Sequence, residues 1–395
     1  MNENIVVVYG SGASHASGYK VRVIEKKDRK NFVQPISPPT DKGFFKEIRD
    51  DFLEEEYPAL NMFKHLIYGT NSCVGMEEVW TALDLNHKHI SLGTFYWDKE
   101  TQDYIDLIKK RKIKDKYPHS DWKVHNRKYK LTGDCGRDFR RLIYNIYSNY
   151  NEPDKRENRF KSLHDKILRA KNCRLLGYIT FNYDCYLENA IKTDFLYVTV
   201  NNDNREAPKG HVPIIKLHGS LNWEQNSSYT DVIFHSPFYE KDKQVKPNYS
   251  SDNDYIQPAI IPPTIFKQEI NDDSRLIEPL SRAILRQWRN AIAILQEADK
   301  ILFVGYSFPD ADFHSKRIFQ ISNMIRRREN DKQPVQILDC VGPKYSTKIL
   351  FCMKSNGHEK RDLFKSIFGK DADIKTIYTF DKLLESKVLK EFLNT

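Results

Sequence analysis

Short and almost continuously apolar segments recur along the 395-residue chain, and each of them ends in glycine or polar residues. Between them lie stretches whose apolar residues are spaced three and four positions apart, as in amphipathic helices. A strand that is buried on both faces has this nearly continuous apolar character, which is typical of parallel sheets covered by helices. We therefore predict the α/β class: a Rossmann-like parallel sheet with helices on both faces. The strand segments include NIVVVYG, CRLLGYITFNYD, VPIIKLHGS, KILFVGYSFPD and PVQILDCVGP.

The same pattern predicts a single Rossmann-like domain over residues 1–395 that is interrupted twice. Residues 42–171 have helical spacing and no strand pattern, which indicates an inserted helical subdomain. Residues 224–257 are rich in Ser, Asn, Asp, Tyr and Lys and show little periodicity, so we expect a loop-rich insertion there. Residues 345–395 are predicted to form a C-terminal tail.

Composition narrows the class of protein. With 39% hydrophobic and 30% charged residues, the chain is globular rather than disordered. We expect a cytoplasmic protein without membrane contact, because no apolar run reaches membrane-spanning length and MNENIVVVYGSG leads directly into a strand. The net charge of +9 is spread over mixed runs such as KKRKIKDK, so we do not expect direct nucleic-acid binding.

Six cysteines are scattered along the chain, and no two of them form a C-x-x-C pair. Zinc sites of the Cys-rich kind use such pairs as ligands. The sequence therefore predicts neither a disulfide framework nor a bound metal.

A glycine-rich turn follows the first strand, with Gly10, Gly12 and Gly18 close together. Glycine permits close backbone approach, and the N-terminus of a following helix offers N–H groups to a phosphate. The spacing departs from G-x-G-x-x-G, because His15 occupies the place of the third glycine. An ordinary strand-to-helix turn remains the alternative.

Polar residues also end the later strands: Asn182 and Asp184, then His218, then Gly305 and Ser307. The carboxyl ends of strands in an open α/β sheet are where ligands bind. Histidine is the most frequent general base, although a single histidine can be structural, and Asn or Asp at a strand end can simply cap a helix. Because these groups end strands of one sheet, we expect them to converge on one crevice.

Together these motifs resemble those of the sirtuin superfamily. GSGASHASG is similar to its Gly-Ala-Gly-x-Ser signature with Ser11 in place of Ala, and TFNYD is similar to its Thr-Gln-Asn-x-Asp motif with Phe181 in place of Gln. LHGS carries the His-Gly pair, and VGYS resembles the Gly-Thr-Ser phosphate contact. The four-Cys zinc module of protein-deacylating sirtuins is absent, since no cysteine lies between His218 and Cys340. IIPPT and GYSFPDAD instead resemble the sirtuin-like NAD-cleaving proteins of bacterial antiphage defence.

The resemblance implies a role for each residue, with NAD as substrate and no zinc. Asn182 would bind the nicotinamide ribose and place the attacking water, Asp184 would meet the carboxamide or ribose, and His218 would accept a proton. The residues implied in phosphate binding are Gly10, Ser11, Gly12, Ala13, Ser14, Gly305 and Ser307.

The resemblance further implies an NAD+ glycohydrolase (NADase) that gives nicotinamide and ADP-ribose and depletes NAD in antiphage defence by abortive infection. A protein deacylase using the same crevice and a non-catalytic sensor of NAD or ADP-ribose are the alternatives. The expected partners are NAD+, further copies of the chain in a homo-oligomer, and a HerA-type ATPase. Residues 42–171 are our candidate for the oligomer contacts.

Overall fold

The fold is taken from a computed structural model of the whole chain, which divides into two compact units. Unit 1 comprises residues 1–20, 152–219 and 282–395, and unit 2 comprises residues 21–151 and 220–281. The structure describes residues 2–21, 37–40, 44–46, 48, 50–69, 74–88, 127–148, 150–151, 157–192, 195–197, 211–226, 232–234, 256–261, 278–306, 308, 313–329, 336–340, 357–368, 370, 372–377 and 379–394.

Unit 1 is built on a seven-stranded sheet with the order β12-β11-β10-β1-β4-β6-β5, in which every neighbouring pair is parallel. The predicted α/β class with a parallel sheet is therefore confirmed. The strands are β1 (Glu3–Tyr9), β4 (Cys173–Thr180), β5 (Phe195–Tyr197), β6 (Val212–Lys216), β10 (Lys300–Val304), β11 (Gln336–Cys340) and β12 (Asp373–Ile377).

The centre of the sheet is its most apolar part. In β1, the residues from Ile5 to Val8 are fully buried, as expected for a strand covered on both faces. Val8 pairs with Phe303 of β10 on one side and with Ile179 of β4 on the other. The neighbours of the first strand thus come from distant parts of the sequence.

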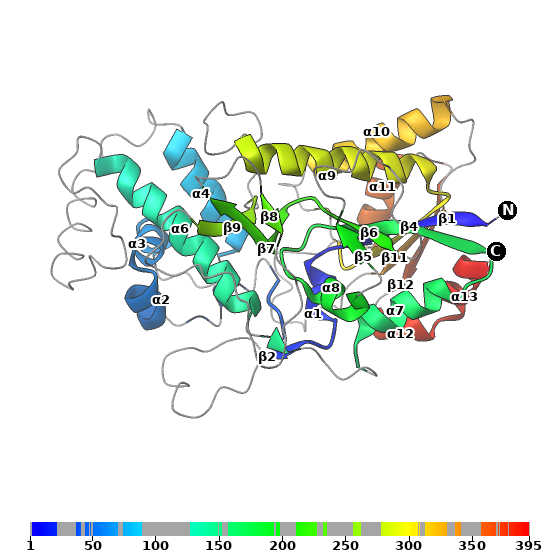
Figure 1. Cartoon of the computed structure of the whole chain (residues 1–395), viewed down its shortest axis with the longest axis horizontal. Helices are drawn as coiled ribbons and strands as arrows, with labels where there is room; N and C mark the ends of the chain where they lie inside the picture. The colour runs from blue at the N-terminus through cyan, green and yellow to red at the C-terminus, as the bar shows by residue number, and fades with distance from the viewer. Residues whose placement is uncertain are drawn as a thin grey trace. The chain divides into compact units, whose positions relative to one another are not determined.

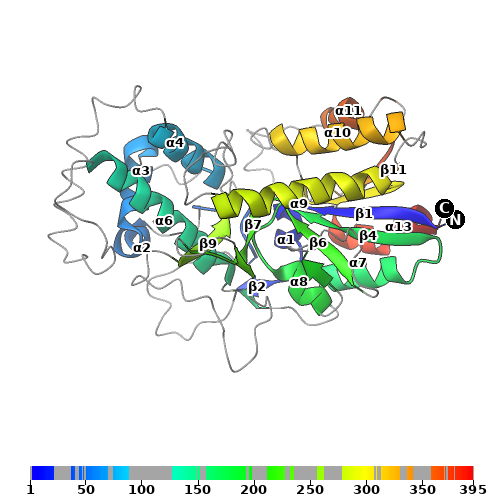
Figure 2. The same cartoon turned by 45° about the horizontal axis from the view of Figure 1, so that its top comes forward.

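Helices cover both faces of this sheet, as predicted (Figures 1 and 2). On one face, Val6 and Phe303 belong to a core that includes Leu295, Phe319 and Phe364 of three helices. On the other face, the Tyr9 ring meets Phe160 edge-on, with 4.9 Å between the ring centroids. The first face carries α9 (Glu278–Glu297), α10 (Phe313–Glu329) and α11 (Gly357–Phe368); the second carries α1 (Ser11–His15), α7 (Arg159–Leu168), α8 (Tyr186–Ile191), α12 (Phe380–Glu385) and α13 (Lys387–Asn394).

Unit 2 combines four described helices with a three-stranded sheet of order β8-β7-β9. Phe139 contacts the rings of Phe45 and Trp80 in its core, and the Asp138 carboxylate accepts hydrogen bonds from two N–H groups at the start of a helix. The elements are α2 (Asp50–Glu56), α3 (Pro58–Tyr68), α4 (Met76–Lys88), α6 (Arg127–Ser148), β7 (Gly219–Asn226), β8 (Ile233–Phe234) and β9 (Ile256–Ile260); β2 (Lys20–Val21) and β3 (Tyr150–Asn151) form a separate pair.

Two features differ in detail from the predicted organisation. The helix α7 lies inside the predicted 42–171 insertion, but it groups with unit 1 because its apolar side packs under the sheet. The predicted 345–395 tail carries β12, the edge strand of the sheet. An edge strand is less completely covered than a central one, and this strand, DIKTI, has only two apolar residues, so it lacks the continuous apolar run that marked the others. Most of the predicted 224–257 insertion lies outside the described residues.

None of the helices in the described part of the chain is both long enough and apolar enough to cross a membrane.

Candidate active site

The polar strand ends lie at one edge of the sheet. β10, β1, β4 and β6 are consecutive neighbours and run in the same direction, so their carboxyl ends share an edge. Gly305, Gly10 and Asn182 follow β10, β1 and β4, and His218 follows β6. This edge is where open α/β sheets bind ligands.

Backbone packing between two turns explains the glycines at this edge. Gly305 has φ +64°, and a Cβ atom there would lie 2.1 Å from the Ala13 nitrogen and 2.4 Å from the Gly12 carbonyl carbon. A Cβ atom on Gly10 would lie 2.6 Å from the Gly305 oxygen. The backbones of the turn after β1 and the turn after β10 are therefore in direct contact. Any residue other than glycine at Gly10 or Gly305 would place a side chain inside this contact.

The N–H groups predicted to face phosphates are largely used within the protein. Gly10 N donates to Val304 O (3.1 Å), Gly12 N to Gly305 O (3.0 Å), and Ala13 N to Gly10 O (2.9 Å). Ser11, the first residue of the five-residue α1, is exposed. A phosphate could use the three bonded N–H groups only after a shift of the turn, so phosphate binding here stays a prediction.

Ser14, Asn182 and Asp184 form one buried hydrogen-bonded network. The Asn182 side-chain amide donates to Gly10 O (3.0 Å) and to Ser14 Oγ (2.8 Å). The Ser14 hydroxyl donates in turn to Asp184 Oδ2 (2.6 Å). Both amide hydrogens of Asn182 are thus engaged, which leaves its carbonyl oxygen as the acceptor that it can offer to a ligand.

The carboxyl group of Asp184 is held in an unusual electrostatic state. Burial raises the pKa of Asp184 from its ordinary 3.8 to about 6, against the lowering effects of the Lys216 ammonium and the Ser14 hydrogen bond. The Glu188 carboxylate raises it further, and the Tyr186 N–H, which donates to Oδ1 (3.1 Å), lowers it. A group with this pKa can change its protonation state near neutral pH.

His218 lies in the turn that ends β6 and is 5% exposed. Leu217 ties the turn to the sheet and to a helix: its N–H donates to Thr180 O of β4 (3.0 Å), and its carbonyl accepts from Trp288 Nε1 of α9 (2.9 Å). The His218 ring meets Phe181 edge-on at 5.4 Å between ring centroids. His218 is therefore held next to the residue that precedes Asn182.

Three residues of this region were not predicted from the sequence. Tyr306 stacks on Phe181 with centroids 4.0 Å apart and planes 7° from parallel, which joins the turn after β10 to the turn after β4. Lys216 and Glu188 form a buried ion pair of 2.8 Å next to Asp184. The only signal in the sequence was a lysine at the end of the apolar segment VPIIK.

The structure thus brings most of the predicted site residues together, with direct contacts among Gly10, Gly12, Ala13, Ser14, Asn182, Asp184 and Gly305 and with His218 beside Phe181. Ser307 lies outside the described residues. Across the described ranges, no group of three or more His, Cys, Asp and Glu residues is placed to hold a metal ion.

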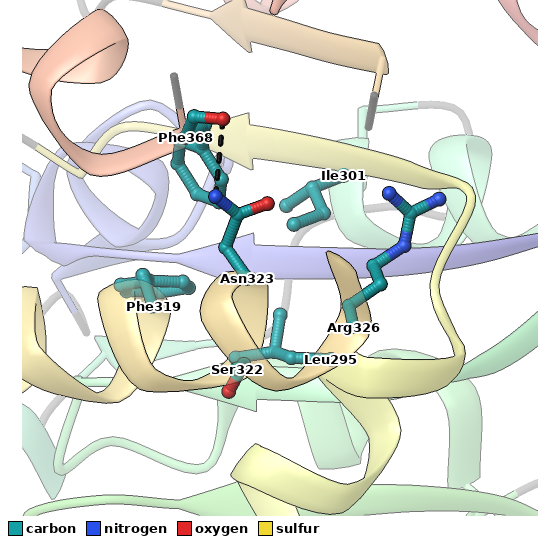
Figure 3. A pocket seen from close by; sticks show the side chains of 7 residues that line it. All are labelled: Leu295, Ile301, Phe319, Ser322, Asn323, Arg326 and Phe368. Carbon is teal, nitrogen blue, oxygen red and sulfur yellow. Dashed lines mark hydrogen bonds between the residues drawn. The ribbon is translucent and has the colours of Figure 1, made fainter. Parts of the chain in front are cut away.

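A separate small pocket lies away from this edge (Figure 3). Asn323 donates its side-chain amide across it to Phe368 O (3.1 Å). The pocket includes Ile301, near the amino end of β10, and none of the predicted site residues. It is therefore distinct from the candidate active site. The lining residues are Leu295, Ile301, Phe319, Ser322, Asn323, Arg326 and Phe368.

The chain is thus an α/β protein with a parallel sheet and with polar residues gathered at the carboxyl edge of that sheet. Residues 176–344, less than half of the chain, match the model of the SIR2-like domain. That segment includes Asn182, Asp184, His218 and Gly305, whereas the glycine-rich turn after β1 lies before it.

Solved structures of Sir2 proteins also align with the chain at low identity. A Sir2 homologue in complex with NAD aligns at 12% identity and a TM-score of 0.37, over 99% of this chain and 88% of the other. A mutant Sir2 homologue bound to ADP-ribose aligns at 11% identity and a TM-score of 0.35, over 99% and 92%. Comparison with curated proteins found no match. The fold assignment rests on the strand order and pairing in this chain.

The buried Asp184 predicts an inverse pH dependence of stability. Since its folded-state pKa of about 6 lies above the ordinary value, the folded state holds a proton that the unfolded chain releases near pH 4. Its favourable contribution is present below about pH 4 and is lost as the pH rises through about 6. We expect Asp184→Asn, which cannot ionise, to be more stable than the wild type by about 3 kcal/mol at pH 7.5.

Urea unfolding at several pH values measures this difference. The gap between Asp184→Asn and wild type should close below pH 4, whereas Asp362→Asn, which removes an exposed carboxylate, serves as the control. A variant that becomes progressively less stable than wild type as the pH rises would contradict the prediction.

Proposed function

We propose that this chain is an NAD+ glycohydrolase that cleaves the bond between nicotinamide and ribose. The observation that carries the proposal is the buried Ser14–Asn182–Asp184 network at the carboxyl edge of the sheet, with His218 packed against Phe181, the residue before Asn182. The SIR2-like match over residues 176–344 supports it, as does the resemblance of the motifs to those of sirtuin-like NADases.

Cleavage of the nicotinamide–ribose bond requires groups that this site contains. As the glycosidic bond breaks, its electron pair leaves with nicotinamide and positive charge develops at ribose C1′, which fixed dipoles and a carboxylate can stabilise. The carbonyl oxygen of Asn182 can accept a hydrogen bond from a water or a ribose hydroxyl, and its orientation is set by its two donated bonds. The attacking water adds its oxygen to C1′ and gives up one proton, for which His218 is the proposed base.

The wider biological role follows from the same resemblance. We propose that NAD cleavage depletes the cytoplasmic pool during antiphage defence and that the chain works as a homo-oligomer with a HerA-type ATPase. Zinc and direct nucleic-acid binding have no part in the proposal. Light scattering of the chain alone and with a HerA-type ATPase would measure both kinds of assembly.

The first experiment is to incubate the purified chain with NAD, with and without that ATPase, and to measure free nicotinamide. We expect release without any acylated peptide and its loss in Asn182→Ala. Release that requires an acylated peptide would instead identify a deacylase. Bound but uncleaved NAD under both conditions would identify a sensor.

A further inference from the structure

A buried ion pair lies next to the network. Lys216 and Glu188 are 0% and 1% exposed, and the Lys216 ammonium donates to Glu188 Oε1 at 2.8 Å. The same ammonium donates to the main-chain carbonyl of Asp184. Lys216 therefore contacts both Asp184, a member of the network, and Glu188, its charged partner on α8.

The backbone places this pair accurately. Lys216 is the last residue of β6, it pairs in register with Thr180 of β4, and its N–H donates to Gln287 Oε1 (3.1 Å). Glu188 lies in the first turn of α8, which begins two residues after Asp184. The pair thus joins the end of β6, where His218 follows, to the segment that carries Asp184.

Stability alone is a weak reason for such a pair. Removing two charges from water costs so much that a buried ion pair often stabilises a fold no better than apolar residues of the same size. A role at the site accounts for its position.

We propose that Lys216 and Glu188 are positioning residues of the active site: the pair holds the main chain of Asp184 and sets the charge on its carboxyl group. The inference rests on the proposed function, in which Asp184 acts as a carboxylate.

The two charges act on Asp184 in opposite directions. The ammonium of Lys216 lowers the pKa of Asp184 and the carboxylate of Glu188 raises it, with Lys216 the stronger of the two. The other groups that face Asp184 are the Ser14 hydroxyl on α1 and the Tyr186 N–H on α8, and both favour the carboxylate; the Cys185 thiol lies near Lys216. Burial lowers the pKa of Lys216, but Glu188, Cys185 and Asp184 together outweigh it, so the lysine stays charged.

Because Lys216 and Glu188 shift the pKa of Asp184 in opposite directions, removing each of them gives a test that a merely structural role would not pass. In profiles of kcat/KM against pH for nicotinamide release, Lys216→Met should move the acidic limb to higher pH, by roughly one unit or more. Glu188→Gln should move it to lower pH. Both variants should also lower the plateau by about tenfold or more, because Asp184 loses its support. Limbs that coincide with wild type, or that move in the same direction, would overturn the proposal.

Each single variant leaves one charge buried without its partner, so the double variant Lys216→Met/Glu188→Gln guards against loss of folding. Its circular dichroism should match wild type, and its acidic limb should lie between those of wild type and Lys216→Met. A wild-type limb and plateau in the folded double variant would also overturn the proposal.

Lys300 supplies the matched control. It is equally buried, pairs with Glu3, and donates to Phe392 O (2.6 Å) at the amino end of β10. Lys300→Met therefore removes a comparable buried ammonium away from the site, and we expect the acidic limb to stay at its wild-type pH.

A second readout separates this inference from the proposed function. In protein labelled with carboxyl-13C aspartate, the Asp184 signal is assigned by its loss in Asp184→Asn, and its titration is followed by NMR. Titration midpoints that move up in Lys216→Met and down in Glu188→Gln support the pair even if the wild type releases no nicotinamide, an outcome that would refute only the proposed function. Unmoved midpoints would refute the role of the pair.

Discussion

His218→Ala is expected to lower the rate of nicotinamide release by about 10²–10⁴-fold, the usual contribution of a general base. The turn after β6 holds the imidazole against Phe181, the residue before Asn182, so its removal takes away the proposed proton acceptor without cutting the Asn182–Ser14–Asp184 network. Because a general base acts in the chemical step, the loss should appear mainly in kcat.

Chromatography of nicotinamide over time measures this loss. His211→Ala is the matched control, since His211 is an exposed histidine directly before the same strand and should leave the rate unchanged. A folded His218→Ala protein that keeps its rate within a few-fold of wild type would exclude His218 as the base.

Gly305→Ala is expected to give the largest loss of stability among single changes at the site, more than about 3 kcal/mol. The residue has φ +64°, and its new methyl group would stand 2.1 Å from Ala13 N and 2.4 Å from the Gly12 carbonyl carbon. These are backbone atoms, so a side-chain rotation cannot relieve the overlap, and either the turn after β1 or the end of β10 must move. We also expect nicotinamide release to be lost, because the displaced turn carries Ser14.

Gly69→Ala separates the two causes of this loss. Gly69 has a similar φ of +59°, but among the described residues other than its chain neighbours no atom lies within 4 Å of the Cβ position. The positive-φ backbone alone should cost about 1–3 kcal/mol. Urea unfolding of both variants gives the comparison, and equal losses would show that close packing at Gly305 contributes nothing.

The central strands could be predicted from the sequence because burial on both faces removes polar residues from them. β1 is the clearest case, with four consecutive fully buried residues from Ile5 to Val8. The edge strand β12 could not be predicted in this way. Its sequence, DIKTI, holds only two apolar residues, Ile374 and Ile377, and both are buried.

The site shows the same division. A strand-end Asn or Asp can be found by its place in the sequence, as Asn182 and Asp184 are. The Lys216–Glu188 pair depends on the register of β6 against β4 and on the direction in which α8 leaves the sheet. Neither the register nor the helix direction can be inferred from nearby residues. The sequence alone therefore does not show whether the lysine at the end of β6 is buried or exposed.

The strand order also has a consequence for how the protein is made. β1 emerges from the ribosome before the other described strands of the sheet, yet its neighbour β10 begins only at Lys300. At about 5–20 residues per second, the central strand stays without that partner for roughly 15–60 s. An apolar segment exposed for so long is prone to aggregate during synthesis, so production of soluble protein should improve at low temperature or with added chaperones that shield nascent chains.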